Sequence, residues 1–86
     1  MKNTVFILPG FGLGTYPLQA LADCLTTQGY TTQFLPLPEQ APLDAYLHSL
    51  IQRHHITANS MVLGWSLGGQ LASLLAERTQ CRLITL

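Results

Sequence analysis

The fold is decided by the stretch Gly64-Trp65-Ser66-Leu67-Gly68-Gly69. It follows the short apolar run Met61-Val62-Leu63 and opens a helical pattern, so a strand, a sharp turn and a helix are predicted around a central serine. Gly64 and Gly68 have no side chain, which allows the strand and the helix to approach closely on either side of the turn. In this context G-x-S-x-G holds Ser66 in a strained backbone geometry with its hydroxyl clear of the sheet, which makes it a candidate nucleophile. The competing interpretation is a glycine-rich turn with an ordinary surface serine.

On both sides of this stretch the sequence predicts alternating strands and helices. Continuous apolar runs with β-branched and aromatic residues are typical of strands buried on both faces, and apolar residues at i, i+3, i+4 and i+7 are typical of helices packed on one face. We expect strands at residues 5–8, 30–35, 61–65 and 82–86, and helices at residues 15–28, 43–55 and 67–80. The order βαβαβαβ predicts the α/β class, with a parallel sheet, right-handed crossovers and helices on both faces. No linker or repeat interrupts the pattern, so residues 1–86 are expected to form a single domain.

A second glycine-rich loop, Pro9-Gly10-Phe11-Gly12-Leu13-Gly14, follows the first predicted strand. Its glycines let the backbone come close to a neighbour, but it lacks the spacings of a dinucleotide or phosphate loop, so a plain turn is the competing interpretation. Open parallel sheets bind ligands at the carboxyl ends of their strands, where the strand order reverses. If the first and third strands are neighbours, this loop faces Ser66. The backbone N–H groups of Phe11 and Leu67 then form a two-donor oxyanion hole.

The composition argues against several classes of protein. Only 9% of the residues are charged and 48% are hydrophobic, and the four lysines and arginines form no basic run of the kind that binds nucleic acid. No apolar stretch approaches the ~20 residues of a membrane span. The run Val5-Phe6-Ile7-Leu8 is too short for a signal-peptide core of about 7–15 residues. Cys24 and Cys81 have no metal or redox spacing, so we expect free thiols in a cytoplasmic protein with no metal and no cofactor.

The two loops together give the chain a family resemblance. It resembles the N-terminal half of the α/β-hydrolases, and most closely the bacterial pimeloyl-[acyl-carrier protein] methyl ester esterases, which carry an apolar strand, a Gly-aromatic-Gly loop and a Gly-Trp-Ser-Leu-Gly-Gly turn. The resemblance implies a serine carboxylesterase of biotin biosynthesis that acts on a small-molecule or carrier-protein-linked acyl ester. It implies Ser66 as nucleophile, Leu67 and Phe11 as oxyanion donors, and Phe11 and Trp65 as residues that flank the acyl group. Pro9 is a departure, since the family usually has His at that place.

The other two members of a catalytic triad have no counterpart in the expected places. In this family an Asp and then a His follow the serine, but only 20 residues follow Ser66 and none is Asp or His. His48, His54 and His55 precede the serine on a predicted helix, where solvated surface or helix-end charge is the competing interpretation. The resemblance therefore implies a partial hydrolase domain, apparently truncated at its C-terminal end, whose partner is the missing C-terminal half. We expect little or no turnover from these 86 residues alone, because a serine without a base is a weak nucleophile.

Two other kinds of function stay open. Acyltransferases and thioesterases use the same loops on the same fold. In a non-catalytic α/β module, Ser66 would be vestigial and the sheet edge at Leu83-Ile84-Thr85-Leu86 would bind a partner. A nucleotide-binding domain is disfavoured because both glycine loops lack the required spacings.

Overall fold

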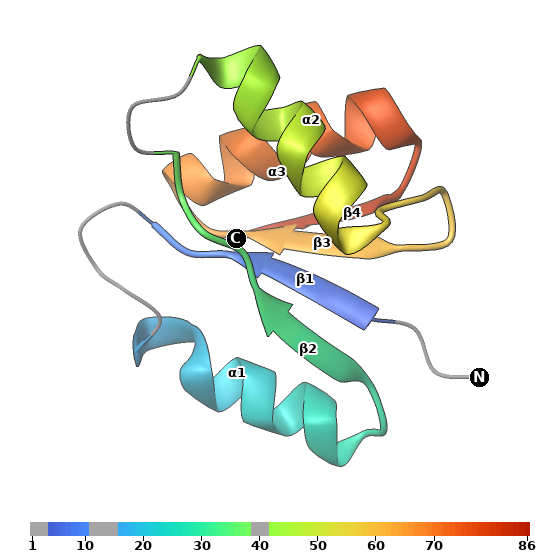
Figure 1. Ribbon diagram of the computed structural model, residues 1–86. Helices are drawn as coiled ribbons and strands as arrows, with labels where there is room; N and C mark the ends of the chain where they lie inside the picture. Colours follow the sequence, from blue (N-terminus) through green and yellow to red (C-terminus); the bar gives the residue numbers. More distant parts are fainter. Residues whose placement is uncertain (1–3, 11–15, 39–41) are drawn as a thin grey trace.

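The computed structural model describes residues 4–10, 16–38 and 42–86. Its strands are β1 (Thr4–Leu8), β2 (Thr31–Phe34), β3 (Met61–Gly64) and β4 (Arg82–Thr85). They form one sheet in the order β2-β1-β3-β4, and every neighbouring pair is parallel (Figure 1). The predicted parallel sheet is therefore confirmed. Its first and third strands are neighbours, which is the condition for the two glycine-rich loops to meet.

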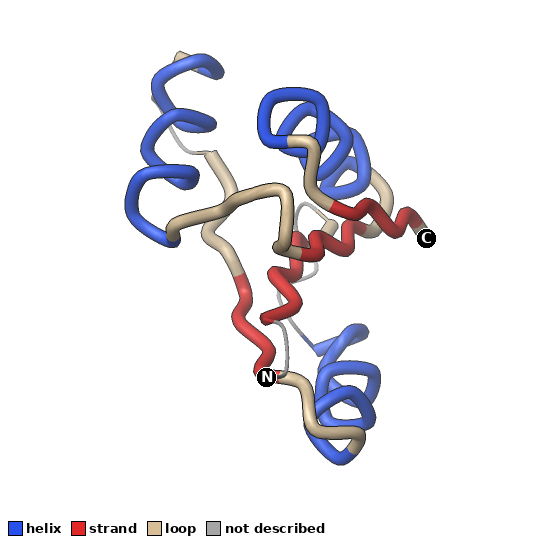
Figure 2. The backbone as a smooth tube through the Cα atoms, turned by 90° about the vertical axis from the view of Figure 1, so that its right-hand side faces the viewer, coloured by secondary structure: helices blue, strands red, loops and turns tan. Residues whose placement is uncertain are grey.

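Three helices connect the strands, namely α1 (Tyr16–Thr27), α2 (Leu43–His54) and α3 (Leu67–Thr79). Helix α1 covers one face of the sheet, and α2 and α3 cover the other face, as Figures 1 and 2 show from two directions. The predicted order βαβαβαβ and the α/β class are confirmed. The predicted second strand is too long at its start, because the Tyr30 N–H donates to the Leu25 carbonyl of α1 (3.0 Å) and Tyr30 belongs to the helix end.

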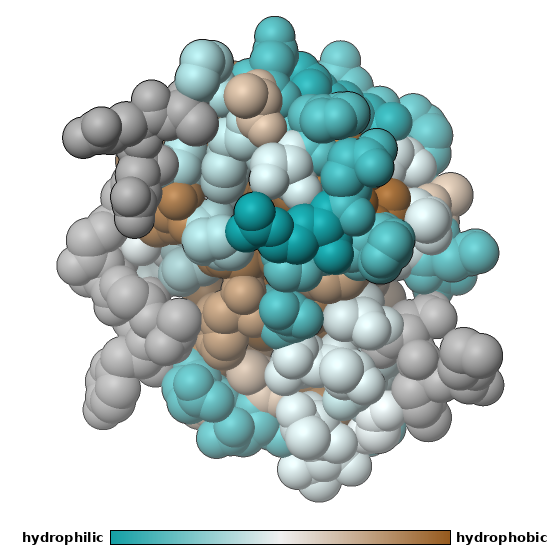
Figure 3. Space-filling model, in the orientation of Figure 1, coloured by the Kyte–Doolittle hydropathy of each residue, from teal (hydrophilic) through white to brown (hydrophobic). Residues whose placement is uncertain are grey.

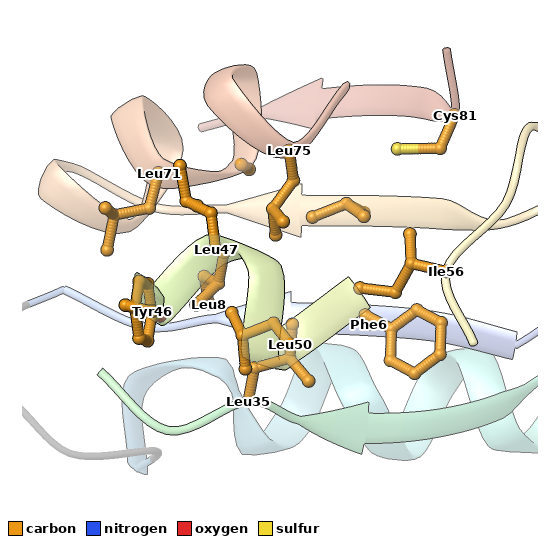
Figure 4. Packing of buried hydrophobic residues seen from close by; sticks show 12 residues of the cluster. Phe6, Leu8, Leu35, Tyr46, Leu47, Leu50, Ile56, Leu71, Leu75 and Cys81 are labelled. Carbon is orange, nitrogen blue, oxygen red and sulfur yellow. The ribbon is translucent and has the colours of Figure 1, made fainter. Parts of the chain in front are cut away.

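The larger apolar core lies between the sheet and the layer of α2 and α3 (Figure 4). In it, Phe6 and Leu8 of β1 meet Leu47 of α2 and Leu75 of α3, and the side chains of Leu8, Leu47 and Leu75 are fully buried. The burial of a side chain of this size contributes about 1.5–3 kcal/mol relative to leaving it exposed. The outer side of this helix layer carries hydrophilic side chains (Figure 3). The apolar positions at helical spacing in α2 and α3 therefore fix these helices on the sheet.

A smaller apolar core lies on the opposite face, under α1. Val5 and Ile7 of β1 alternate with the residues that face the larger core, so β1 is buried on both faces. Leu18 and Ala22 of α1 close over them. This double burial explains why the first strand has a continuous apolar run instead of an alternating one.

Strand β4 forms one edge of the sheet, and all four of its residues are exposed. Leu83 and Ile84 keep 41% and 40% of their surfaces accessible, although they point to opposite faces of the sheet. Within the described residues, no strand pairs with the outer side of β4. The apolar edge that the sequence predicts at this strand is therefore present.

The helices are short. The longest, α3, has 13 residues, and none of the helices in the described ranges has the length and apolarity that a membrane crossing requires.

Candidate functional site

Ser66 lies at the tip of the turn between β3 and α3. Its backbone has φ 59° and ψ −124°, a region that a residue with a side chain rarely adopts. Such a conformation costs of order 1–3 kcal/mol and persists only where the surrounding structure imposes it. The strained, exposed serine that the glycine pattern predicts is therefore present in the structure.

The hydroxyl of Ser66 is not used to cap the helix that it precedes. Serine before a helix usually accepts a hydrogen bond from a backbone N–H of the first turn, but the Ser66 side chain makes no capping bond to α3. The backbone holds the turn instead, since Gly68 N–H donates to the Trp65 carbonyl and Gly69 N–H to the Ser66 carbonyl, both at 2.9 Å. An ordinary capping serine is thus disfavoured, and the hydroxyl is left available for other chemistry.

Two glycines make this turn possible through close packing. A Cβ atom at Gly68 would overlap the Leu8 carbonyl oxygen and lie 2.5 Å from that of Pro9. A Cβ atom at Gly64 would overlap the Gly68 carbonyl oxygen. No L-residue other than glycine fits at either place without a backbone shift. The role that the sequence assigns to these glycines follows from two contacts of α3, with β3 at Gly64 and with the end of β1 at Gly68.

Backbone hydrogen bonds from both neighbouring strands fix the turn. Trp65 N–H donates to the Leu8 carbonyl at the end of β1 (3.1 Å). Leu86 N–H donates to the Gly64 carbonyl (2.9 Å), and Ser66 N–H donates to the Leu86 carbonyl (3.4 Å). The contribution of Leu86 is not predictable from the sequence, where this residue is only the end of an apolar strand.

The N–H of Leu67 begins α3, directly after the serine. No carbonyl of the described residues accepts a hydrogen bond from it, as is usual for the first N–H groups of a helix. The positive end of the helix dipole lies at the same place. This N–H is therefore suited to stabilise negative charge that develops on an atom bound to Ser66.

The loop after β1 meets the serine turn at the same edge of the sheet. The Cβ position of Gly10 lies 3.5 Å from Ser66 Cβ and 3.6 Å from Trp65 Cε3. The predicted encounter of the two glycine-rich loops is thus seen at Gly10. Phe11 and Gly12, predicted as oxyanion donor and structural glycine, lie outside the described residues.

Trp65 is half-buried and packs against the smaller core under α1. Its ring lies beside Gly10, next to Ser66. Both interpretations from the sequence, a core aromatic and a residue beside the reacting group, agree with this position.

The histidines lie away from Ser66. His48 is exposed on α2, and His55 ends that helix in a left-handed conformation with φ 54°. The ring of His54 packs edge-on against Phe6, with 5.9 Å between the ring centroids. No side chain of the described residues forms a hydrogen bond with the Ser66 hydroxyl. No general base for the serine is therefore identified among the described residues.

The carboxylates have other partners. Asp23 accepts a hydrogen bond from Gln19 (3.0 Å) one turn away on α1, and Asp44 of α2 pairs with Arg78 of α3. Among the residues that the structure describes, no cluster of His, Cys, Asp and Glu side chains has the geometry of a metal site.

A scan against protein-family models and a search of curated proteins found no match to this chain. The geometry of the serine turn is therefore the basis for a functional proposal.

Proposed function

We propose that this chain carries the nucleophile of a serine hydrolase that cleaves carboxylic esters through an acyl-serine intermediate. The observation that carries the proposal is the backbone of Ser66. It is strained, its hydroxyl is exposed without capping α3, and Gly10 lies beside it. Strain of this kind is concentrated at active sites. The G-x-S-x-G turn between a strand and a helix is the context in which such a serine acts as a nucleophile.

In the proposed reaction, the oxygen of Ser66 bonds to the ester carbonyl carbon while its proton passes to a base. The electron pair of the carbonyl moves to oxygen, where the N–H of Leu67, together with that of Phe11, stabilises the negative charge. Collapse of this intermediate expels the alcohol, which takes the proton from the base. Water then attacks the acyl-serine by the same steps and releases the acid. Loss of one oxyanion donor typically slows such a reaction about 100–1000-fold.

The general base and its carboxylate are proposed to come from a part of the protein outside these 86 residues. The support is the resemblance to α/β-hydrolases, in which the Asp and His follow the serine. The chain alone is then expected to show little turnover, because an unactivated hydroxyl is a weak nucleophile. The resemblance to pimeloyl-[acyl-carrier protein] methyl ester esterases supports an acyl ester as substrate and a role in biotin biosynthesis. The free thiols of Cys24 and Cys81 support a cytoplasmic location.

The test is labelling of the full-length gene product with an alkyl fluorophosphonate. We expect one adduct, at Ser66, that Ser66→Ala abolishes. The matched control is Ser73→Ala on the same helix, whose hydroxyl donates to the Gly69 carbonyl and which should label normally. A folded full-length protein that takes up no label would overturn the proposal. Acyl transfer and thioester cleavage pass through the same acyl-serine. Comparison of ester with thioester substrates separates thioester cleavage from ester hydrolysis, and product analysis with added alcohols or thiols as acceptors identifies acyl transfer.

A second candidate function is an interaction module that binds through β4. The observation that favours it is the exposure of Leu83 and Ile84 on an edge strand. In this case Ser66→Ala should leave the protein's interactions intact, whereas Ile84→Lys should abolish them.

A further inference from the structure

The peptide groups on both sides of Ser66 are fixed by hydrogen bonds. In the group before it, the Trp65 carbonyl accepts from Gly68 N–H (2.9 Å). The Ser66 N–H of the same group donates to the Leu86 carbonyl (3.4 Å). In the group after it, the Ser66 carbonyl accepts from Gly69 N–H (2.9 Å). The orientations of these two planar groups set φ and ψ of the serine, and with them the direction of its side chain.

Among these partners, Leu86 lies outside the helix that the serine precedes. The two donors, Gly68 and Gly69, belong to the first turn of α3 itself. Leu86 is in turn anchored on β3, since its N–H donates to the carbonyl of Gly64, the last residue of that strand (2.9 Å). The end of β4 therefore holds the turn by two bonds of one residue, one to the strand before the turn and one to the serine.

A serine before a helix also has a less strained conformation. With φ in the ordinary negative range, serine is a preferred N-cap, and its hydroxyl accepts a hydrogen bond from the N–H of the second or third helical residue. In α3 these residues are Gly68 and Gly69. Ser66 has φ 59° and makes no such bond, and both glycine N–H groups donate to backbone carbonyls instead. The strained conformation thus leaves the hydroxyl available, whereas the capping conformation would engage it.

We infer that Leu86 is a positioning residue for the nucleophile. Its backbone holds Ser66 in the strained conformation, and without it the serine relaxes and caps α3. The effect on catalysis rests on the proposed function, because it assumes that the Ser66 hydroxyl attacks an ester. The inference goes beyond that function by assigning control of the nucleophile to β4, a strand whose side chains take no part in the proposed reaction.

The experiment removes the Leu86 N–H from the full-length gene product with Leu86→Pro. Proline has no N–H, so the bond to Gly64 is lost and the ring displaces the end of β4 from the turn. We expect labelling of Ser66 by an alkyl fluorophosphonate to become about 10–100-fold slower, as a shift on the order of 1 Å can cause. The matched control is Arg82→Pro. It removes the corresponding bond at the start of β4, from Arg82 N–H to the Ser60 carbonyl (3.0 Å), and should leave the labelling rate unchanged.

A second readout distinguishes positioning from a general loss of structure. The midpoint of urea unfolding is compared with and without Ser66→Ala in each background. In the wild type and in Arg82→Pro, Ser66→Ala removes no capping bond and should leave the midpoint unchanged. In Leu86→Pro it removes the new cap and should lower the midpoint. Where Leu86→Pro does not fold, an ester in place of the Thr85–Leu86 amide removes the same N–H without the proline ring.

The outcomes separate this inference from the proposed function. Equal labelling rates in Leu86→Pro and the wild type, or an equal slowing in Arg82→Pro, would overturn the inference. The same effect of Ser66→Ala on the unfolding midpoint in every background would also overturn it. Absence of labelling in the wild type would overturn the proposed function, and the unfolding midpoints would still decide whether Leu86 holds the serine.

Discussion

At the scale of single residues, the turn at Ser66 depends on one strained conformation and two missing side chains. The φ of 59° places the hydroxyl outside the helix cap, and Gly64 and Gly68 let the flanking elements touch. The strained conformation opposes stability, since it costs free energy that the hydrogen bonds with Leu8 and Leu86 must offset. At Ser66, function and stability should therefore respond in opposite directions to substitution, whereas the glycines permit the packing on which stability depends.

Replacing Ser66 by glycine should stabilise the protein while removing its hydroxyl. Glycine adopts positive φ without strain, so we expect Ser66→Gly to raise the free energy of unfolding by about 1 kcal/mol over Ser66→Ala. Both variants lack the hydroxyl, so their difference isolates the backbone term. Urea unfolding of the two variants measures it. Equal stability would mean that the turn is not strained in solution.

Gly68→Ala should be strongly destabilising, because its methyl group would overlap the Leu8 carbonyl oxygen of β1. Overpacking of this kind typically costs about 1–3 kcal/mol, and more where the neighbour is backbone. The adjacent Gly69 is the control. Its Cβ position is 3.4 Å from the nearest atom, the Gly64 carbonyl oxygen, so Gly69→Ala in the helix should be near neutral or stabilising. Thermal unfolding of Gly68→Ala and Gly69→Ala measures the difference in stability. Similar losses of stability in the two variants would contradict the close packing of Gly68 against β1.

At the scale of the elements, α2 is held in place by its buried side chains and by one hydroxyl. Tyr46 donates a hydrogen bond to the Pro36 carbonyl in the segment after β2 (2.7 Å), and Arg78 of α3 pairs with Asp44. The ion pair is exposed and contributes little, about 0–1 kcal/mol. The tyrosine is buried, so it links α2 to the end of β2 more strongly than the charges link α2 to α3.

Because Tyr46 is buried and donates a hydrogen bond through its hydroxyl, we expect the protein to lose stability in alkali. Burial raises the pKa of Tyr46 from its ordinary value of 10.0 to about 12, because desolvation disfavours the phenolate. The folded state thus holds the proton more tightly than the unfolded state. This contribution is complete below pH 10 and is lost as the pH rises toward 12. Urea unfolding should show a lower free energy of unfolding at pH 11 than at pH 9. In Tyr46→Phe this difference between the two pH values should be smaller. The variant should also be less stable at pH 9, by about 1 kcal/mol, because it lacks the hydrogen bond to Pro36. The same alkaline loss in Tyr46→Phe would assign the effect to other groups.

At the scale of the whole molecule, the two edges of the sheet differ. Strand β2 carries polar residues such as Gln33 at its edge, whereas β4 presents Leu83 and Ile84. An exposed apolar edge strand is a template for pairing with another strand. We expect the 86-residue chain to self-associate through β4 as its concentration rises.

Ile84→Lys should suppress this association without a large loss of stability, because the side chain is already 40% exposed. Gln33→Lys, an equal charge on the opposite edge strand, is the control and should leave the association unchanged. Light scattering over a range of concentrations measures the effect. A similar response in the two variants would show that net charge, and not the β4 edge, controls association.

The sequence predicts the arrangement of this molecule better than its details. The apolar runs and the two glycine loops predict the order of elements and the position of Ser66, because the periodicities and the glycine requirement are local properties. The edge-on packing of His54 against Phe6 and the bonds of Leu86 to the serine turn depend on parts distant in the sequence, so no local pattern predicts them. The predicted start of the second strand at Tyr30 is wrong for a local reason, since the end of α1 engages its N–H.

The most direct measurement is a crystal structure of the full-length gene product after reaction with an alkyl fluorophosphonate. We expect phosphorus to be bonded to Ser66 Oγ and the phosphoryl oxygen to lie about 2.7–3.1 Å from the Leu67 nitrogen at the start of α3. An adduct on another side chain, or a phosphoryl oxygen directed away from that nitrogen, would contradict it.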